Sequence, residues 1–166
     1  RRYAREGVEA VLVGMNPGPY GMLQTGVPFG DVGMVRDWLG IEAPVAQPPD
    51  QHPKRPVLGF AVRRGEVSGR RVWGWARERF GSPERFFAHC FVTNYCPLGL
   101  FAADGANLTP DGLKSAQRDA LQAVCDDALQ RSLEVLRPRA VVGIGRFAEQ
   151  RLQEIAPALG IRVVGV

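Results

Sequence analysis

Histidine and cysteine are scarce in this chain, and their scarcity argues against several kinds of site. The 166 residues include two histidines, His52 and His89, and three cysteines, Cys90, Cys96 and Cys125. The cysteines form no CxxC pair, which argues against a zinc ribbon and against a cysteine-ligated iron–sulfur cluster. The two histidines are too few and too far apart for a metal centre. We therefore expect no metal, no cofactor, and free, mostly buried thiols in a reducing compartment.

Long hydrophobic runs are also absent. No stretch of about 18 apolar residues occurs, so the sequence predicts no helix that spans a membrane. The first residues show neither an apolar core nor a cleavage site, so we expect no signal peptide, and the missing initiator Met suggests that upstream residues were lost. With 45% hydrophobic and 23% charged residues, the chain suits one compact domain, predicted over residues 1–166.

The charge balance is mildly basic. Lys and Arg total 21 against 17 Asp and Glu, a formal net charge of +4. Such an excess favours polyanions such as DNA through counterion release. Many enzymes without nucleic-acid partners are equally basic, so charge alone does not indicate a DNA-binding protein.

Four short apolar runs, rich in β-branched residues, are strand candidates: residues 10–13, 89–93, 140–144 and 161–164. The first and third are almost continuously apolar, which is typical of strands covered on both faces by helices. The sequence therefore predicts an α/β fold, a three-layer α/β/α sandwich around a central four-stranded parallel sheet.

The clearest helical pattern covers residues 110–136. Thr109 is the expected N-cap, with Pro110 at the first helical position and Pro138 beyond the end. An apolar stripe recurs at helical spacing. Its members are Leu121, Val124, Cys125, Ala128, Leu129 and Leu136.

Three further helices and one long loop complete the prediction. Helices are expected over residues 70–80, ending at Gly81, over residues 32–39, and from Gly145 to Pro157. Residues 42–56 contain five prolines and no periodicity, which indicates an extended surface loop.

The loop after the first strand candidate, residues 14–31, carries most of the functional information. In open α/β sheets, ligands bind at the carboxyl ends of strands. Five glycines and three prolines restrict the backbone and allow it to approach a ligand closely. Asn16, Gln24 and Thr25 offer polar groups there. Apolar walls would come from Met15, Tyr20, Met22 and Phe29. Such a slot suits a flat heterocycle.

Two phosphate-binding motifs do not fit this loop. The Walker pattern fails because no Gly-Lys-Ser/Thr follows, and the GxGxxG fingerprint fails because the spacing is wrong and Pro17 intrudes. On composition alone, a rigid Gly/Pro turn without a ligand is an equally good interpretation.

Longer sequence motifs favour a ligand site in this loop. GMNPGP at residues 14–19 and QTGVPFG at 24–30 resemble the first motif of the uracil-DNA glycosylase superfamily, in the version of its single-strand-selective monofunctional branch. The similarity continues, in order, along nearly the whole chain. The further words are MVRDWLG (34–40), HPKRPVLG (52–59), EVSG (66–69) and NLTP (107–110).

The resemblance implies a role for each matching residue. Asn16 would be catalytic, holding a water aimed at the anomeric carbon of a flipped nucleotide. Asn94, at the end of the second strand candidate, would read the N3–H and O4 of uracil. Phe29 would stack on the base. Gly18 and Met22 would shape the pocket near the 5-position, beside Met15 and Tyr20, where Tyr20 replaces the commoner Phe.

Each of these assignments has a structural alternative. Asn16 could simply bond its own turn, Phe29 could pack in the core, and Asn94 could cap a strand end. Arg146 lies where a strand meets a helix N-terminus and is a candidate for contact with a DNA phosphate, although arginines are also common on solvated helix faces.

The implied function is hydrolysis of the N-glycosidic bond of uracil and of 5-substituted uracils such as 5-hydroxymethyluracil in DNA. No lysine occupies a matched position, so no lyase step is expected. The family's second motif, His-Pro-Ser-Pro-Arg, is expected just beyond Val166, and the 166 residues alone should be severely impaired.

Two other interpretations remain open. The pocket could bind a nucleobase or damaged DNA without catalysis, or the chain could be a small nucleotide-binding α/β domain. The expected partner is single- or double-stranded DNA, with no membrane association and a monomeric state. The location would be cytoplasmic in a bacterium and nuclear in a eukaryote.

Overall fold

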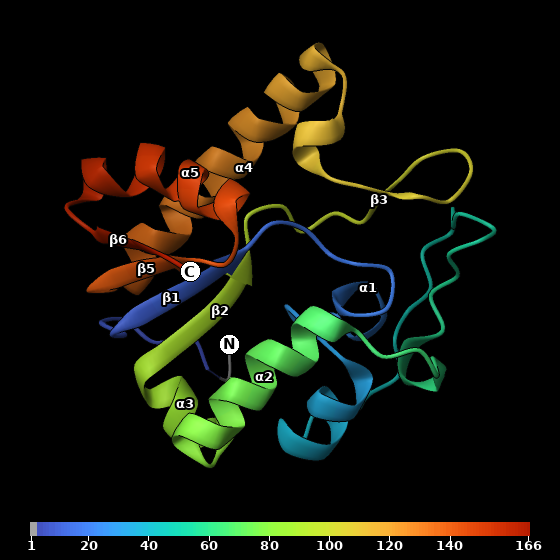
Figure 1. Ribbon diagram of the computed structural model, residues 1–166, viewed down its shortest axis with the longest axis horizontal. Coiled ribbons are helices and arrows are strands. Elements are labelled where there is room, and N and C mark those ends of the chain that lie inside the picture. Colours follow the sequence, from blue (N-terminus) through green and yellow to red (C-terminus); the bar gives the residue numbers. More distant parts are fainter. Residues whose placement is uncertain (1–2) are drawn as a thin grey trace. The chain divides into compact units, whose positions relative to one another are not determined.

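Four parallel strands form the main sheet of the computed structural model, which describes residues 3–166. Their order is β2-β1-β5-β6, and all three pairings are parallel (Figure 1). The strands are β1 (Ala10–Gly14), β2 (Cys90–Asn94), β5 (Ala140–Gly143) and β6 (Arg162–Gly165). The predicted parallel sheet is confirmed, and each strand lies within about a residue of its predicted position.

The chain divides into two compact units, which we describe separately. Unit 1 comprises residues 1–16, 87–97 and 109–166 and contains the sheet with helices α4 (Ser115–Leu136) and α5 (Arg146–Ile155). Unit 2 comprises residues 17–86 and 98–108 and contains α1 (Met22–Thr25) and α2 (Val67–Phe80). Helix α3 (Pro83–His89) crosses the boundary and leads directly into β2.

The core of unit 1 lies between the sheet and the two helices α4 and α5. Val11, Val13 and Val141 project from one face of the sheet into this core. On α4 it is lined by residues at spacings of four, four and three: Cys125, Leu129, Leu133 and Leu136. The opposite face of the sheet is covered as well, because Leu12 and Val92 are also buried. Two covered faces explain the nearly continuous apolar strands.

A polar network joins β2, α4 and α5 at the edge of this core. The Tyr95 hydroxyl donates to Asp126 Oδ1 at 2.7 Å, and Arg151 forms an ion pair with the same carboxylate. Burial is the main reason that the pKa of Tyr95 lies above its ordinary value. The three cysteines are buried and form no disulfide, as expected, and burial raises the pKa of Cys90 to about 11.

The predicted helix over residues 110–136 is wrong at its start. Thr109 precedes a separate 3-10 turn, Pro110–Gly112, and makes no side-chain capping bond. Leu113 and Lys114 are then extended, with ψ near 158° and 147°, and α4 begins only at Ser115. Gly112 is a poor helix residue, which favours this interruption.

The predicted apolar stripe of α4 is partly wrong. Val124 is 68% exposed, and Ala128 is exposed as well, whereas Leu133, which the stripe omitted, is fully buried. Along an α-helix, positions 125, 129, 133 and 136 share one face, and position 124 is turned about 100° away from position 125.

The other helical predictions hold in part. Helix α2 ends at Phe80 before Gly81 as predicted, but it begins three residues earlier than predicted, capped by Glu66. The helix predicted over residues 32–39 is mostly a π-helical turn, Met34–Trp38. Helix α5 ends at Ile155 and continues as a 3-10 turn, Ala156–Leu159, that contains Pro157.

Unit 2 contains short elements that the sequence patterns did not predict. These are α1, a 3-10 turn at Gly59–Ala61, and a two-stranded hairpin of β3 (Leu100–Phe101) and β4 (Asn107–Leu108). Helix α3 was not predicted either. Residues 42–56 have neither helix nor strand and are mostly exposed, as predicted for a loop.

Membrane-spanning helices and metal-binding clusters are both absent from the described residues. None of the helices within residues 3–166 is both long enough and apolar enough to cross a membrane. The same residues contain no group of three or more His, Cys, Asp or Glu side chains that could share a metal ion.

The burial pattern of α4 makes a stability prediction. Leu133→Ala should lower the free energy of unfolding by about 2–5 kcal/mol because it opens a cavity in the core. Val124→Ala, one face away on the same helix, should change it by less than about 0.5 kcal/mol. Urea unfolding of both variants checks this; equal losses would mean that the helix face is wrongly assigned.

Candidate active site

The carboxyl edge of the sheet in unit 1 is the natural place for a ligand. From β1 the chain crosses to β2 on one side and later to β5 on the other. This reversal creates a topological switch point at the carboxyl end of β1, where open α/β sheets bind their ligands. The sheet thus directs attention to the residues that immediately follow β1 and β2.

Both candidate asparagines lie at this edge. Asn94 is the last residue of β2 and is in register with Gly14, the last residue of β1, and Asn16 follows two residues later. The two segments continue side by side beyond the strands, because Tyr95 N–H donates to Gly14 O and Cys96 N–H donates to Met15 O, both at 2.8 Å. The predicted juxtaposition of Asn16 and Asn94 at one sheet edge is confirmed.

The chemistry of this pair follows from the amide group. Asn16 and Asn94 are each partly exposed, so neither residue is fully buried in the core or fully solvated. Each amide offers one acceptor oxygen and two donor hydrogens, and neither acts as a general base. Together they can hold a water and match a donor–acceptor pattern on a heterocycle. Their individual roles stay predictions.

Residues 17–31, the part of the loop after β1 that belongs to unit 2, are here called the motif loop. Side chains of the loop itself stabilise its conformation. Thr25, which is buried, donates to Gly30 O at 3.1 Å and accepts from Val27 N–H at 3.3 Å. Buried Gln24 connects more distant parts of the chain. Its Nε2 donates to Pro19 O at 2.8 Å, and its Oε1 accepts from Leu58 N–H at 2.8 Å.

These contacts change the interpretation of two residues. Gln24 and Thr25 were predicted to be polar groups of a ligand slot, yet their polar atoms bond the backbone of their own unit. They therefore shape the loop and are not placed to contact a ligand. A side chain already bonded inside a loop cannot be distinguished by sequence from one that faces a ligand.

Phe29 has an unusual backbone. Its φ is +55°, a left-handed conformation that only one other non-glycine residue among residues 3–166 adopts. An L residue is strained there, and such strain persists where the surroundings hold it. Gly69 on α2 provides such surroundings, because a Cβ at that position would lie 2.0 Å from the Phe29 carbonyl oxygen.

Asp31 and Glu66 lock the end of the loop to the start of α2. Asp31 is buried, and its carboxylate accepts from Met34 N–H at 3.2 Å and from Glu66 N–H at 2.8 Å. Glu66 in turn caps α2 by accepting from Gly69 N–H at 2.7 Å. Burial raises the pKa of Glu66, an effect that the bond from Gly69 partly offsets. The sequence patterns predicted neither the role of Asp31 nor that of Glu66.

Packing does not explain the glycine at position 18. A Cβ on Gly18 would meet its nearest neighbour, Glu66 Oε1, at an ordinary 3.8 Å, whereas a Cβ on Gly21 would lie 2.8 Å from Glu66 Cγ. Packing against Glu66, the cap of α2, therefore favours a glycine at position 21 but not at position 18. A small residue that packing does not demand fits its predicted place in a ligand pocket.

Tyr20 is held by two arginines of unit 2. Its hydroxyl accepts from Arg55 Nη1 at 2.8 Å and from Arg64 Nη1 at 3.2 Å, and the Arg64 guanidinium carbon lies 4.4 Å from the ring centre. The hydroxyl that a phenylalanine would lack thus accepts two hydrogen bonds. Met22, the first residue of α1, is partly exposed.

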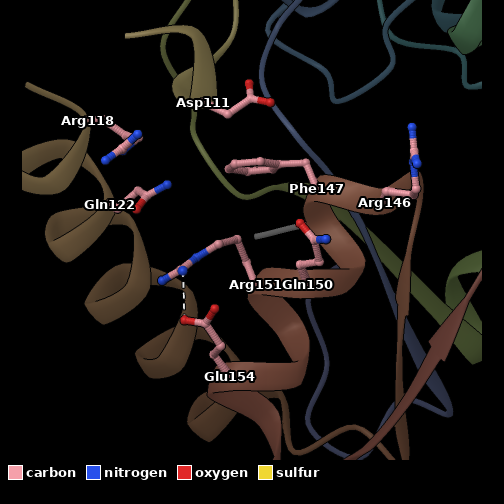
Figure 2. A pocket seen from close by; sticks show the side chains of 8 residues that line it. All are labelled: Asp111, Arg118, Gln122, Arg146, Phe147, Gln150, Arg151 and Glu154. Carbon is pink, nitrogen blue, oxygen red and sulfur yellow. Dashed lines mark hydrogen bonds and ion pairs between the residues drawn. The ribbon is translucent and has the colours of Figure 1, made fainter. Parts of the chain in front are cut away.

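Arg146 begins α5 directly after Gly145 and is exposed. It makes no hydrogen bond or ion pair with any residue in the described range 3–166. A pocket of about 440 Å³ lies beside it, and Figure 2 shows the Phe147 ring across its middle and the Arg146 side chain at one side. The remaining lining residues are Asp111, Arg118, Gln122, Gln150, Arg151 and Glu154.

The charge of this pocket is mixed. Arg151 is already paired with Asp126 and with Glu154, the latter at 2.7 Å, and Arg118 bonds its neighbour Asp119. Of the three arginines in this pocket, Arg146 at the N-terminus of α5 is the one that forms no hydrogen bond or ion pair within residues 3–166. Contact between Arg146 and a phosphate remains a prediction.

The candidate residues thus fall into two groups. Met15, Asn16, Asn94 and Arg146 belong to unit 1, and the first three converge where β1 and β2 end. The others, Gly18, Tyr20, Met22 and Phe29, belong to the motif loop in unit 2.

Comparison with known proteins assigns the family. The model of the uracil DNA glycosylase superfamily matches residues 2–165, nearly the whole chain. The chain belongs to the uracil DNA glycosylase superfamily. This match confirms the predicted family and, with the parallel sheet, the predicted three-layer α/β/α fold.

Individual relatives carry the name of one branch of the superfamily. The chain is 54% identical over 158 residues to the single-strand selective monofunctional uracil DNA glycosylase of Bos taurus and 53% identical to that of Mus musculus. Each alignment covers 95% of this chain but only 58% and 57% of the relative, so the chain spans little more than half the length of these relatives.

A solved structure of this superfamily shares the fold. The crystal structure of wild-type SMUG2 from Pedobacter heparinus aligns with a TM-score of 0.67, covering 96% of this chain and 64% of that one. At 20% identity, this match supports the arrangement of the backbone and no residue role.

The packing of α2 against the motif loop can be tested with two glycines of one helix. Gly69→Ala places a methyl group against the Phe29 carbonyl, so it should destabilise the protein by more than about 1 kcal/mol and reduce any activity that depends on Phe29. Gly74→Ala has no neighbour within 4 Å and should stabilise the helix by up to about 1 kcal/mol. Thermal unfolding of both variants measures the contrast, and a tolerated Gly69→Ala would contradict this packing.

Proposed function

We propose that this protein is a monofunctional uracil-DNA glycosylase, which hydrolyses the N-glycosidic bond of a damaged nucleotide and leaves an abasic site. The observation that carries the proposal is the placement of Asn16 and Asn94 together at the ends of β1 and β2. Similarity to glycosylases over 95% of the chain adds to it.

In the proposed reaction, Asn16 positions a water against the anomeric carbon of a nucleotide that has left the base stack. The bond between the sugar carbon and the base nitrogen breaks, and its electron pair leaves with the base. The water oxygen then bonds to the sugar carbon and loses a proton, and the departed base anion gains one through the solvent to become the free base. Since an amide is not a base, Asn16 contributes by orientation and by stabilising the positive charge on the sugar.

Base recognition is assigned to Asn94 and Phe29. The Asn94 amide can accept from N3–H of uracil and donate to O4, whereas cytosine presents the reverse pattern and would leave both groups unpaired. Phe29 offers a ring for the base to stack on, which contributes roughly 1–3 kcal/mol per base in other systems. The strained backbone of Phe29 fits a ring held in a set position.

The finer proposal concerns substrates. The names of the relatives include single-strand selectivity, so we propose uracil in single-stranded DNA as the first substrate to test. Gly18 and Met22 would shape the pocket near the 5-position of the base. The small side of that pocket would accept a 5-hydroxymethyl group; the ordinary 3.8 Å from a Cβ on Gly18 to Glu66 Oε1 supports this proposal.

The central test replaces Asn16. In the full-length protein, Asn16→Ala should reduce release of labelled uracil from a single-stranded oligonucleotide by at least about 100-fold, because the water loses its positioning group. Asn107→Ala removes an exposed amide on β4 and should leave release unchanged. If neither the parent nor the variant releases uracil while both bind the oligonucleotide, the protein is a binding module without catalysis.

A second test addresses the pocket near the 5-position. Gly18→Ala should leave the fold intact, since the new methyl group has ordinary contacts, and should slow release of 5-hydroxymethyluracil more than release of uracil. The ratio of kcat/KM for the two bases measures the effect, with thermal unfolding as the control for folding. An unchanged ratio would place Gly18 away from the 5-position.

A further inference from the structure

A second pocket, wholly within unit 2, is dominated by arginines. It has a volume of about 270 Å³ and lies among the π-helical turn Met34–Trp38, residues 60–65 and the first turn of α2. Four of its lining side chains are arginines, and only one is acidic. We call the set Arg36, Arg63, Arg64 and Arg70 the arginine pocket.

Positive side chains outnumber negative ones in this pocket. Its one carboxylate, Asp31, is buried and already accepts two backbone N–H bonds. Arg36 is paired with Asp37 at 2.8 Å, and Arg70 is attracted to the Glu66 carboxylate, whereas Arg63 forms no hydrogen bond or ion pair within residues 3–166. Like charges repel when gathered around a small pocket, so an anion bound there would relieve this repulsion.

Arg64 is oriented before any ligand arrives. It stacks on the Tyr20 ring and donates to the Tyr20 hydroxyl at 3.2 Å, and Arg55 donates to the same hydroxyl. Holding a long side chain in place reduces the entropy lost on binding. Because Tyr20 belongs to the motif loop, this contact also links the pocket to that loop.

The absence of a side chain at Gly65 makes room for the Arg70 guanidinium. A Cβ at this position would lie 3.1 Å from Arg70 Nη1 and 2.9 Å from Asp31 Oδ2. The missing side chain leaves room there for both the Arg70 guanidinium and the Asp31 carboxylate.

We propose that the arginine pocket binds a backbone phosphate of single-stranded DNA. The proposal rests on the proposed function for the choice of DNA as the polyanion. Guanidinium groups bind phosphate oxygens through paired, charge-assisted hydrogen bonds. The volume of about 270 Å³ is below the roughly 300 Å³ at which pockets for whole small molecules begin, so it suits a phosphate better than a nucleoside.

This site contributes to affinity and position, while base reading is left to the motif loop and Asn94. A phosphate contact carries no sequence information, but it sets the register of the strand. Neutralising one phosphate of a single strand releases counterions. The pocket should therefore contribute about −0.7 to the slope of a plot of log affinity against log salt concentration.

The test uses the full-length protein and a fluorescent, uracil-free single-stranded oligonucleotide, with anisotropy measured over a range of salt concentrations. The double variant Arg63→Gln, Arg70→Gln should weaken binding on the order of ten-fold at low salt and lower the salt slope by about 0.7. The matched control, Arg131→Gln with Arg139→Gln, removes the same charge from exposed positions in unit 1 and should leave the slope unchanged.

Each other outcome has a definite meaning. Equal effects of the two double variants would overturn the pocket, because net charge alone would then explain them. Tighter, pocket-dependent binding of an RNA strand of the same sequence would overturn the choice of DNA. Competition by inorganic phosphate alone, with no loss of oligonucleotide binding in the pocket variant, would make this a site for the free ion.

Two controls separate this proposal from the proposed function. Thermal unfolding should change little in the pocket variant, because Arg63 and Arg70 are exposed and Glu66 keeps its capping bond from Gly69 N–H. The binding assay requires no base release, so a protein that releases no uracil can still show the pocket effect. Conversely, uracil release that depends on Asn16 can persist in a protein whose pocket variant binds DNA normally.

Discussion

The parallel pairing of β1 between β2 and β5 is the constraint on which the site in unit 1 depends. Parallel strands end at the same edge, so Gly14 and Asn94 come into register, and the segments that follow them stay bonded through Met15 and Cys96. The valines of β1 and β5 anchor this edge to α4 and α5. Two amides carried on rigid strand ends keep their geometry more reliably than amides on a mobile loop.

In unit 2, geometry is maintained by buried polar side chains instead of by a sheet. Gln24 and Thr25 bond the loop backbone, and Asp31 and Glu66 connect the end of the loop to α2. Buried polar groups are costly when unpaired, so this satisfied network favours one loop conformation. The left-handed Phe29 is one product of that network, and the orientation of Arg64 on Tyr20 is another.

The two units contribute different kinds of chemistry. Unit 1 presents amides suited to orienting a water and matching a base edge, whereas unit 2 presents a ring, a small glycine and a group of guanidinium charges. The proposed function would use both kinds, because base contacts give specificity and phosphate contacts give affinity and register. In the pocket around Arg146, by contrast, Arg118 and Arg151 are already paired with carboxylates.

The sequence by itself determined the local features of this protein. Continuous apolar runs predicted the four strands, Gly81 marked the end of α2, and asparagines at two strand ends predicted the pair at the sheet edge. Tertiary structure decided what depends on distant neighbours. On α4, Val124 is exposed and Leu133 is buried. Gln24 bonds the loop backbone at Pro19 O. Arg36, Arg63 and Arg70 come from three segments and line one pocket. Periodicity encodes which residues share a face, but only long-range packing determines what that face meets.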